Sequence, residues 1–190
     1  INGRPGPFRG RFDLTRIGVF GHSFGGSQSF RALIDDSRID AAANVDGTVF
    51  DELYKVGTSK PYLSFQSLRA TAAQIDESRQ QLAQIGYSSS QVDWVFEHAV
   101  TDDIAFKNSR GAIQVSIPLA GHNNFTDRGL WQAFGIPSAL VSTDIDSAYV
   151  LRIYQTYLRA FFDEKLRGRF QFLLHRPSCT PDVEVRWSRR

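Results

Sequence analysis

The chain has 190 residues, of which 42% are hydrophobic, 22% charged and 13% aromatic, a globular composition that excludes an intrinsically disordered protein. Its 22 basic and 20 acidic residues are scattered and give a net charge of +2, so they imply no nucleic-acid partner. No apolar run reaches the roughly 18 residues of a membrane span, and the single cysteine, Cys179, excludes a disulfide framework and a multi-cysteine metal site within this chain. Since the chain begins at Ile1 and contains no Met, we expect a processed form or a piece of a longer protein.

The first half of the chain predicts short strands that alternate with helices. Residues 1–10 contain three Gly and two Pro and predict a loop or linker. The apolar run at residues 16–20 predicts a strand that ends at a glycine-rich turn, and residues 27–35 predict a helix with one apolar side. Further strands are predicted at residues 39–45, 61–65 and 113–119.

The remaining segments predict three helices and an edge strand. Apolar residues recur at helical spacing in residues 68–85, 92–100 and 147–166. The last of these helices is expected to end at Gly168, and the alternation at residues 183–187 predicts an edge strand. Strands that end in polar residues, with helices between them, predict an α/β fold with a mostly parallel sheet. We expect one domain over residues 11–187, followed by a tail at 188–190.

The pattern Gly21-x-Ser23-x-Gly25 is typical of a nucleophile elbow. A serine on a sharp strand-to-helix turn adopts a strained backbone, and its hydroxyl projects above the sheet. Because strand and helix pass close together there, residues two before and two after the serine should be small, as Gly21 and Gly25 are, and Gly26 adds room. The amide of Phe24, at the helix N-terminus, is the expected donor to a developing oxyanion.

A serine nucleophile needs a base, and the chain contains four histidines. His22 precedes the serine, His175 lies near the C-terminal end, and His98 falls in a predicted helix, where we expect it to be a packing residue. His122 directly follows the strand predicted at residues 113–119. Since catalytic groups gather at the C-terminal edge of a parallel sheet, we predict His122 as the base.

The acid that orients this base has several candidates. Asp46 ends the strand after the elbow helix, whereas the next strand, at residues 61–65, is followed by no acid. Asp93, Asp102 and Asp103 precede the histidine and stay open as alternatives, although we expect them on a solvated helix end or loop. We prefer Asp46 because it stands at the C-terminal end of a strand.

These stretches resemble the platelet-activating factor acetylhydrolase branch of the α/β-hydrolases, which includes bacterial and fungal carboxylic ester hydrolases. The resemblance covers about residues 11–175 and lies in FGHSFGG (20–26), NVDG (44–47), GHNNFTD (121–127) and YLRAFFD (157–163). Matching these stretches to the family's motifs implies Ser23, Asp46 and His122 as a catalytic triad. The separation between Asp46 and His122 is longer than we expect for the family. The extra length lies at residues 68–110, where a cap or lid, a dimer face and an edge helix are the alternatives.

The resemblance implies the C-terminal portion of an α/β-hydrolase fold, a mostly parallel sheet with flanking helices that lacks the fold's N-terminal strands. It implies a serine esterase that cleaves acetyl or other short-acyl esters, with a role in lipid degradation. The substrate would be a small-molecule or lipid ester, and the chemistry needs no metal or organic cofactor. Two alternatives stay open: a lipase or polyester hydrolase that acts on longer esters, and a non-catalytic hydrolase-like binding module.

Overall fold

The computed structural model describes residues 3–50, 52–67, 72–131, 134–136 and 141–189 of the chain. Its centre is a sheet with the strand order β1-β2-β3-β4-β5. The strands are β1 (Ile17–His22), β2 (Ile39–Val45), β3 (Tyr62–Gln66), β4 (Ile113–Ser116) and β5 (Glu184–Trp187). Strands β1 to β4 run parallel, and β5 pairs antiparallel with β4 at one edge. The mostly parallel sheet and the edge strand near the C-terminus confirm the predictions from the sequence.

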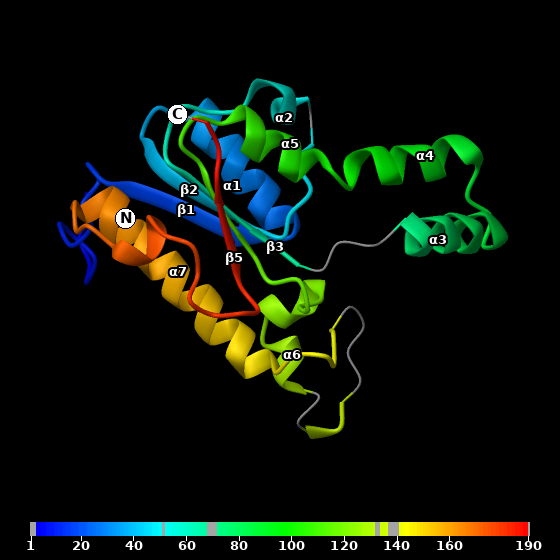
Figure 1. Ribbon diagram of the computed structural model, residues 1–190. Helices are drawn as coiled ribbons and strands as arrows, with labels where there is room; N and C mark the ends of the chain where they lie inside the picture. The colour runs from blue at the N-terminus through cyan, green and yellow to red at the C-terminus, as the bar shows by residue number, and fades with distance from the viewer. Residues whose placement is uncertain (1–2, 51, 68–71, 132–133, 137–140, 190) are drawn as a thin grey trace.

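Helices flank both faces of this sheet (Figure 1). They are α1 (Phe24–Asp35), α2 (Leu53–Val56), α3 (Ala72–Gln84), α4 (Ser89–His98), α5 (Thr101–Asn108), α6 (Arg128–Trp131) and α7 (Ser147–Arg167), with the short 3-10 helices η1 (His122–Phe125) and η3 (Phe172–Leu174). Helices α1 and α5 contribute to the hydrophobic core on one face of the sheet, and α7 contributes to the core on the other face.

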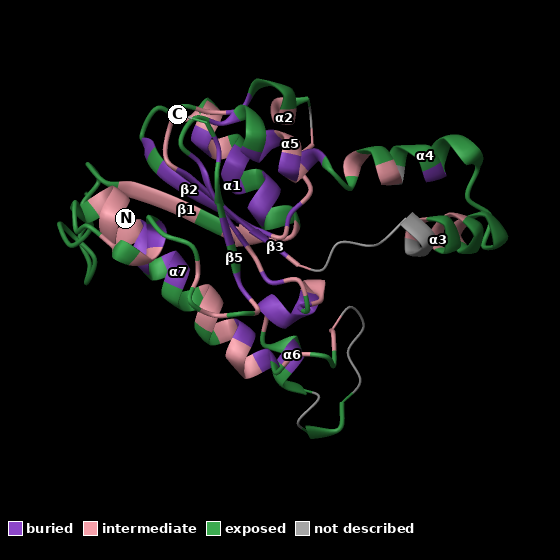
Figure 2. Ribbon diagram, in the orientation of Figure 1, coloured by how far each residue is buried: buried purple, intermediate pink, exposed green. Residues whose placement is uncertain are grey.

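Strand β2 separates these two cores by the alternation of its side chains. Ala41, Ala43 and Val45 belong to the core under α7, whereas Ala42 belongs to the core under α1. All four are completely buried, and Figure 2 shows the centre of the sheet as the most buried part of the molecule. Because these alanine side chains are small, helices can pack closely against both faces of β2, and the strand lies between two layers of helices.

The long helix α7 begins and ends where the sequence predicts. Its N-cap residue, Asp146, accepts a hydrogen bond from the Ala148 amide at 3.0 Å. Its C-cap residue is Gly168, at φ 65°, a left-handed conformation that glycine adopts without a steric penalty. Buried residues on one side of the helix, Val150, Tyr157 and Phe161 among them, pack against the sheet.

Some element boundaries differ from the predictions. Helix α1 starts at Phe24, three residues earlier than predicted, because the helix follows the serine turn directly. Strand β4 ends at Ser116 and is shorter than the predicted segment, since Pro118 has no amide hydrogen to continue the ladder. Helix α5, at residues 101–108, was not predicted. The first residues of the predicted helix 68–85 lie outside the described part of the chain.

Residues 72–98 form a helical hairpin that extends away from the sheet (Figure 1). Within the hairpin, Arg79 of α3 forms an ion pair with Asp93 of α4 at 2.7 Å. The same guanidinium lies 4.7 Å from the centre of the Phe96 ring. Helix α5 differs from the hairpin, because its Ala105 and Phe106 are buried in the core beside α1. In the described residues, no helix has both the length and the apolar character needed to cross a membrane.

Candidate active site

Ser23 lies in the turn between β1 and α1, in a strained backbone conformation. Its φ of 57° and ψ of −125° fall in a region that L-residues rarely occupy. The Ser23 amide donates to the Val45 carbonyl at 2.9 Å, which extends the pairing between the two strands. The Ser23 carbonyl accepts from the Gly26 amide at 2.9 Å and starts the first turn of α1. The serine therefore has the backbone of a nucleophile elbow.

The glycines around Ser23 are crowded in a different pattern from the predicted one. A Cβ on Gly21 would lie 2.3 Å from the Gly25 carbonyl carbon, so Gly21 must be glycine, as predicted. A Cβ on Gly25 would meet open space, which corrects the expectation that this side-chain position is crowded. The tight position is Gly26, where a Cβ would lie 2.0 Å from Asn44 Oδ1. The contact arises because α1 passes over β2 at its second glycine.

Asp46 and His122 are joined by a short hydrogen bond. His122 Nδ1 donates to Asp46 Oδ2 at 2.6 Å. The other carboxylate oxygen, Oδ1, accepts from the Ser67 amide at 2.8 Å, so both oxygens are held. Asp46 follows β2 with a φ of 54°, a second strained residue at the site. Because Nδ1 is used by the carboxylate, Nε2 is the ring nitrogen of His122 that remains for chemistry.

A buried amide fixes the turn that bears Asp46. Asn44 Nδ2 donates to the Gly47 carbonyl at 2.7 Å, and its Oδ1 accepts from the Gly47 amide at 2.9 Å. A Cβ on Gly47 would lie 2.1 Å from the Ser23 carbonyl oxygen, so the acid turn packs directly on the serine turn. The sequence analysis assigned Asn44 no role. The sequence does contain a signal for such a role, because Asn44 stands at the end of a strand, three residues before a glycine in a tight turn.

A second buried amide fixes the loop that bears His122. Asn124 Oδ1 accepts from the amides of Gly121 and Ser142, at 2.7 and 2.8 Å. Its Nδ2 donates to Ser147 Oγ at 2.7 Å, at the start of α7. Asn124 is completely buried. One side chain thus joins the histidine turn, a distant loop and the first residue of α7.

His22, next to the serine, contacts His122 directly. Its Nε2 donates to the His122 carbonyl at 2.9 Å, and the two ring centres lie 4.4 Å apart. Burial lowers the pKa of His22 below that of an ordinary histidine, although the hydrogen bond to the His122 carbonyl and the nearby Asp46 carboxylate oppose this shift. A neutral His22 adds no positive charge beside the candidate base.

A cavity of about 360 Å³ opens above these turns. It is lined by Ser23, Phe24, Asp46, Gly47, Thr48, Phe50, Ser67, Ala99, Asp102 and His122. The Phe24 amide occupies the first position of α1, where an N–H has no acceptor inside the helix. Ser23 and His122 both line this cavity. The hydrogen bond between a catalytic serine and its base is often long without a substrate and shortens when one binds.

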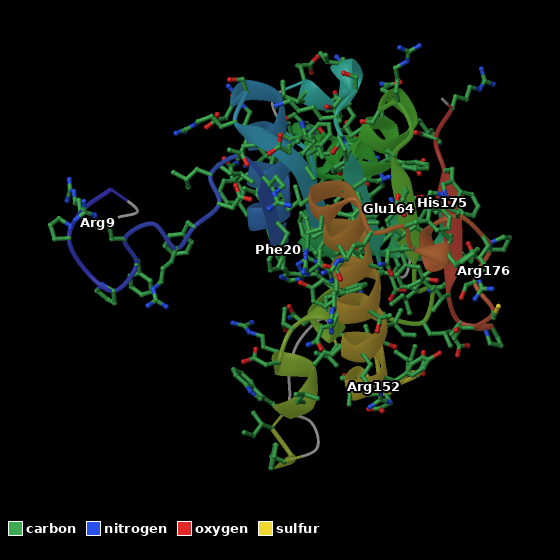
Figure 3. The ribbon with its side chains drawn as sticks, turned by 90° about the vertical axis from the view of Figure 1, so that its left-hand side faces the viewer. Arg9, Phe20, Arg152, Glu164, His175 and Arg176 are labelled. Carbon is green, nitrogen blue, oxygen red and sulfur yellow. The ribbon has the colours of Figure 1, made fainter. Side chains whose placement is uncertain are left out.

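The remaining candidates lie elsewhere or have other partners. His98 is on α4 and stacks on Trp94, and His175 pairs with Glu164 at 2.8 Å on the outside of the molecule, as Figure 3 shows. Asp93 is exposed and pairs with Arg79. The expectation of a solvated helix end or loop is wrong for Asp103, which is buried and accepts from Arg186 at 3.0 Å. Asp102 is partly exposed in the first turn of α5, where it lines the cavity and accepts from Gln66.

The described ranges contain no cluster of three or more His, Cys, Asp or Glu side chains that would hold a metal ion. The groups that meet at the cavity are a serine, a histidine and a carboxylate, together with backbone amides. These are the groups that acyl transfer through a serine requires.

Comparison with known proteins finds relatives among the esterases, while no family model matches the chain. A probable 1-alkyl-2-acetylglycerophosphocholine esterase of Arthroderma benhamiae is 29% identical over 183 residues, which cover 89% of this chain and 43% of that protein. The solved structure of a ferulic acid esterase from Streptomyces cinnamoneus matches with a TM-score of 0.66 and 32% identity, over 91% of this chain and 47% of that one. The chain thus spans less than half the length of these two relatives. In sequence and in fold it is similar to esterases of the α/β type, and the resemblance that its motifs indicate is confirmed.

Proposed function

We propose that this chain bears the catalytic triad of a carboxylic ester hydrolase, with Ser23 as nucleophile, His122 as base and Asp46 as the acid. The observation that carries the proposal is the 2.6 Å hydrogen bond between Asp46 and His122, in the same cavity as a serine with an elbow backbone. Buried asparagines hold the turns of both partners, so the arrangement is rigid before substrate binds.

The proposed reaction follows from these positions. His122 Nε2 removes the proton from Ser23 Oγ as that oxygen attacks the ester carbonyl carbon, and the carbonyl oxygen becomes an oxyanion. The Phe24 amide donates to the oxyanion, while the Asp46 carboxylate stabilises the protonated imidazole. The intermediate collapses, the alcohol leaves with the proton from His122, and an acyl group remains on Ser23. Water, deprotonated by His122, then releases the carboxylic acid and restores the serine.

The substrate class proposed is a carboxylic ester with an acetyl or other short acyl group. The two relatives differ in the group that their names state, acetyl in one and ferulic acid in the other, and share the hydrolysis of a carboxylic ester. A cavity of about 360 Å³ lies at the small end of ligand sites and has room for a short acyl group.

Labelling with a fluorophosphonate probe tests the proposal, because the probe reacts with an activated serine. We expect the intact protein to be labelled and Ser23→Ala to be unlabelled and inactive toward p-nitrophenyl acetate. Asp46→Asn should lower kcat by about 10⁴-fold, since asparagine holds the histidine in the wrong tautomer. Asp93→Asn, which changes an exposed carboxylate paired with Arg79, is the matched control and should keep full activity.

Each part of the proposal has an outcome that contradicts it. Loss of activity in Asp102→Asn, with Asp46→Asn unaffected, would transfer the acid role to Asp102. A folded protein that is not labelled would be a binding module with a hydrolase-like fold. A panel of esters from acetate to palmitate tests the acyl group, and faster cleavage of the long members would indicate a lipase or polyester hydrolase instead.

A further inference from the structure

Four aromatic rings form a continuous surface beside the cavity that contains Ser23. Phe24 lies 6.3 Å from Phe50 between ring centres, and Phe50 lies 6.1 Å from Trp94 with the planes only 10° apart. Trp94 in turn stacks on His98 at 4.3 Å. These four residues, here called the aromatic surface, come from the start of α1, the loop after β2 and one side of α4. The sequence analysis assigned only His98 a packing role and left the other three rings without one.

The aromatic surface is continuous with the candidate active site. Phe24 follows Ser23 in the chain, and both Phe24 and Phe50 line the cavity. At its outer end, Ala99 of the cavity wall follows His98 directly. A group attached to an ester bound at Ser23 would therefore meet these rings.

Burial in the protein core does not explain these rings. Phe24 is 65% exposed and Trp94 is 52% exposed, so each leaves about half or more of its surface in water. Apolar area in contact with water costs free energy, and contiguous exposed apolar surface is typical of a binding site. A ligand that covers these ring faces would remove that cost.

The position of the aromatic surface is fixed by a buried hydroxyl. Thr101 Oγ1 donates to the His98 carbonyl at 2.9 Å and accepts from the Val49 amide at 3.1 Å. Thr101 is 1% exposed, and Val49 directly precedes Phe50. The end of α4 and the loop that bears Phe50 are thereby joined before any ligand binds, which lowers the entropy cost of binding.

We propose that the aromatic surface binds a planar aromatic group of the ester, which places aryl or arylalkyl esters among the substrates. This inference rests on the proposed function, since it concerns the part of the ester beyond the reacting carbonyl. A ring stacks on aromatic side chains in an offset or edge-to-face manner, with a gain beyond that of simple burial. Because a cavity of about 150 Å³ already holds benzene, the 360 Å³ cavity has room for a ring and an ester group.

Paired substrates separate aromatic stacking from hydrophobic burial. Benzyl acetate and cyclohexylmethyl acetate place a flat or a puckered ring on the alcohol side. Methyl 3-phenylpropanoate and methyl 3-cyclohexylpropanoate place the same rings on the acyl side. In both pairs the ring is insulated from the carbonyl, and the cyclohexyl member is the more hydrophobic. A higher kcat/KM for the phenyl member therefore reports stacking, and the pair that shows it identifies the side.

We expect the phenyl member of one pair to have a kcat/KM about two- to tenfold above that of its cyclohexyl partner. Phe24→Leu and Phe50→Leu should reduce this ratio toward one. Because both residues line the cavity, the readout is the ratio within a pair of esters and not the absolute rate on either ester. Phe24 is exposed, so its variant should fold, and leucine retains the backbone amide at that position. Phe172→Leu is the matched control, because Phe172 is 73% exposed on η3, outside the cavity lining. It should keep the full ratio.

The possible results separate this inference from the proposed function. Hydrolysis of all four esters with a ratio near one in both pairs would overturn the aromatic subsite and leave the esterase intact. A ratio that persists in both Phe24→Leu and Phe50→Leu would also overturn it. If no ester is cleaved and the serine is not labelled, the proposed function itself fails. A ratio that falls in the two variants and not in the control supports the subsite.

Discussion

Backbone strain at the candidate site falls on Ser23 and Asp46, the proposed nucleophile and the proposed acid. Ser23 and Asp46 both have a φ above 50°, which non-glycine residues seldom adopt. Each of these backbone conformations costs a free energy of order 1–3 kcal/mol, and the surrounding hydrogen bonds hold the residue in it. In return, the serine hydroxyl and the carboxylate project from the ends of adjacent strands into one cavity.

A pH prediction follows from the burial of His22. Since its pKa is lowered in the folded protein, the unfolded chain binds more protons below about pH 6.5, the ordinary histidine value. We expect the free energy of unfolding to fall as the pH drops through this range, with a slope from His22 of at most about 1.4 kcal/mol per pH unit. His22→Gln retains a donor for the His122 carbonyl and does not titrate, so its stability should fall less.

Urea unfolding of both proteins between pH 8 and pH 5 measures this difference. The curves should be parallel above pH 7.5, where the imidazole is neutral in both states, which serves as the internal control. Titratable groups that do not interact with His22 contribute equally to both proteins and cancel. Identical slopes below pH 6.5 would contradict the lowered pKa of His22.

Individual site residues differ in how well the sequence predicts them. Ser23 and His122 stand in local patterns that reveal them, and Asp46 stands at a strand end. Asn44 holds its turn through Gly47, only three positions away. Asn124, in contrast, holds its turn through partners as distant as Ser142 and Ser147. Such partners depend on which loops meet at the edge of the sheet, so spacing along the chain cannot indicate them.

At the scale of elements, the unit that supports the site is β1, its turn and α1. The second glycine of the Gly25-Gly26 pair gives α1 its close contact with β2, because Asn44 Oδ1 occupies the space beside it. The sequence predicted the close approach at Gly21 and Gly25. Gly21 is crowded as predicted, whereas on the helix side the crowded side-chain position is Gly26 and not Gly25. The pattern shows that strand and helix pass closely, and only the rotation of the helix decides which glycine faces the strand.

Alanine substitutions at these two glycines should have opposite effects on stability. We expect Gly26→Ala to lower the free energy of unfolding by about 1–3 kcal/mol, since the new methyl group overlaps the Asn44 amide. Gly25→Ala adds a methyl group in open space within a helix and should raise stability by about 0.5–1 kcal/mol. Urea titrations give both values, and equal losses would show that crowding at Gly26 is not the cause.

Helix α5 shows why some elements are hard to predict. Its sequence includes Asp102 and Asp103, which favour a solvated segment when considered alone. In the structure Asp103 is buried because Arg186 of β5, 83 positions away, provides a charged partner. The position of β4 and β5 beside α5 therefore decides the burial, and this contact is not encoded locally.

At the scale of the whole molecule, β1 and β5 form the two edges of the described sheet. Each pairs with one described strand only, β1 with β2 and β5 with β4. Phe20 of β1 is 55% exposed and lies near Phe162 of α7, and Figure 3 shows it beside that helix. An exposed edge with apolar side chains is a template for pairing with another chain.

We therefore expect residues 1–190, expressed alone, to self-associate and to have little activity. Phe20→Lys should increase the monomer fraction in sedimentation velocity, because a charge on an edge strand opposes strand pairing. Phe170→Lys is the control, since Phe170 is 61% exposed and lies outside the sheet. Equal gains in both variants would assign the association to general surface hydrophobicity. A monomer with full esterase activity would contradict the prediction altogether.

The hairpin of α3 and α4 has a consequence for how such a molecule diversifies. Its two helices contact each other. Helix α4 contacts the rest of the molecule through the stacking of Trp94 on Phe50 and through Thr101, which joins the His98 carbonyl to the Val49 amide. Insertions or substitutions in the hairpin would therefore reshape the wall next to the substrate at little cost to folding. With the proposed triad at the strand ends and the proposed subsite partly on α4, reaction chemistry is set at one place in the chain, and the part of substrate choice that depends on Trp94 and His98 changes at another.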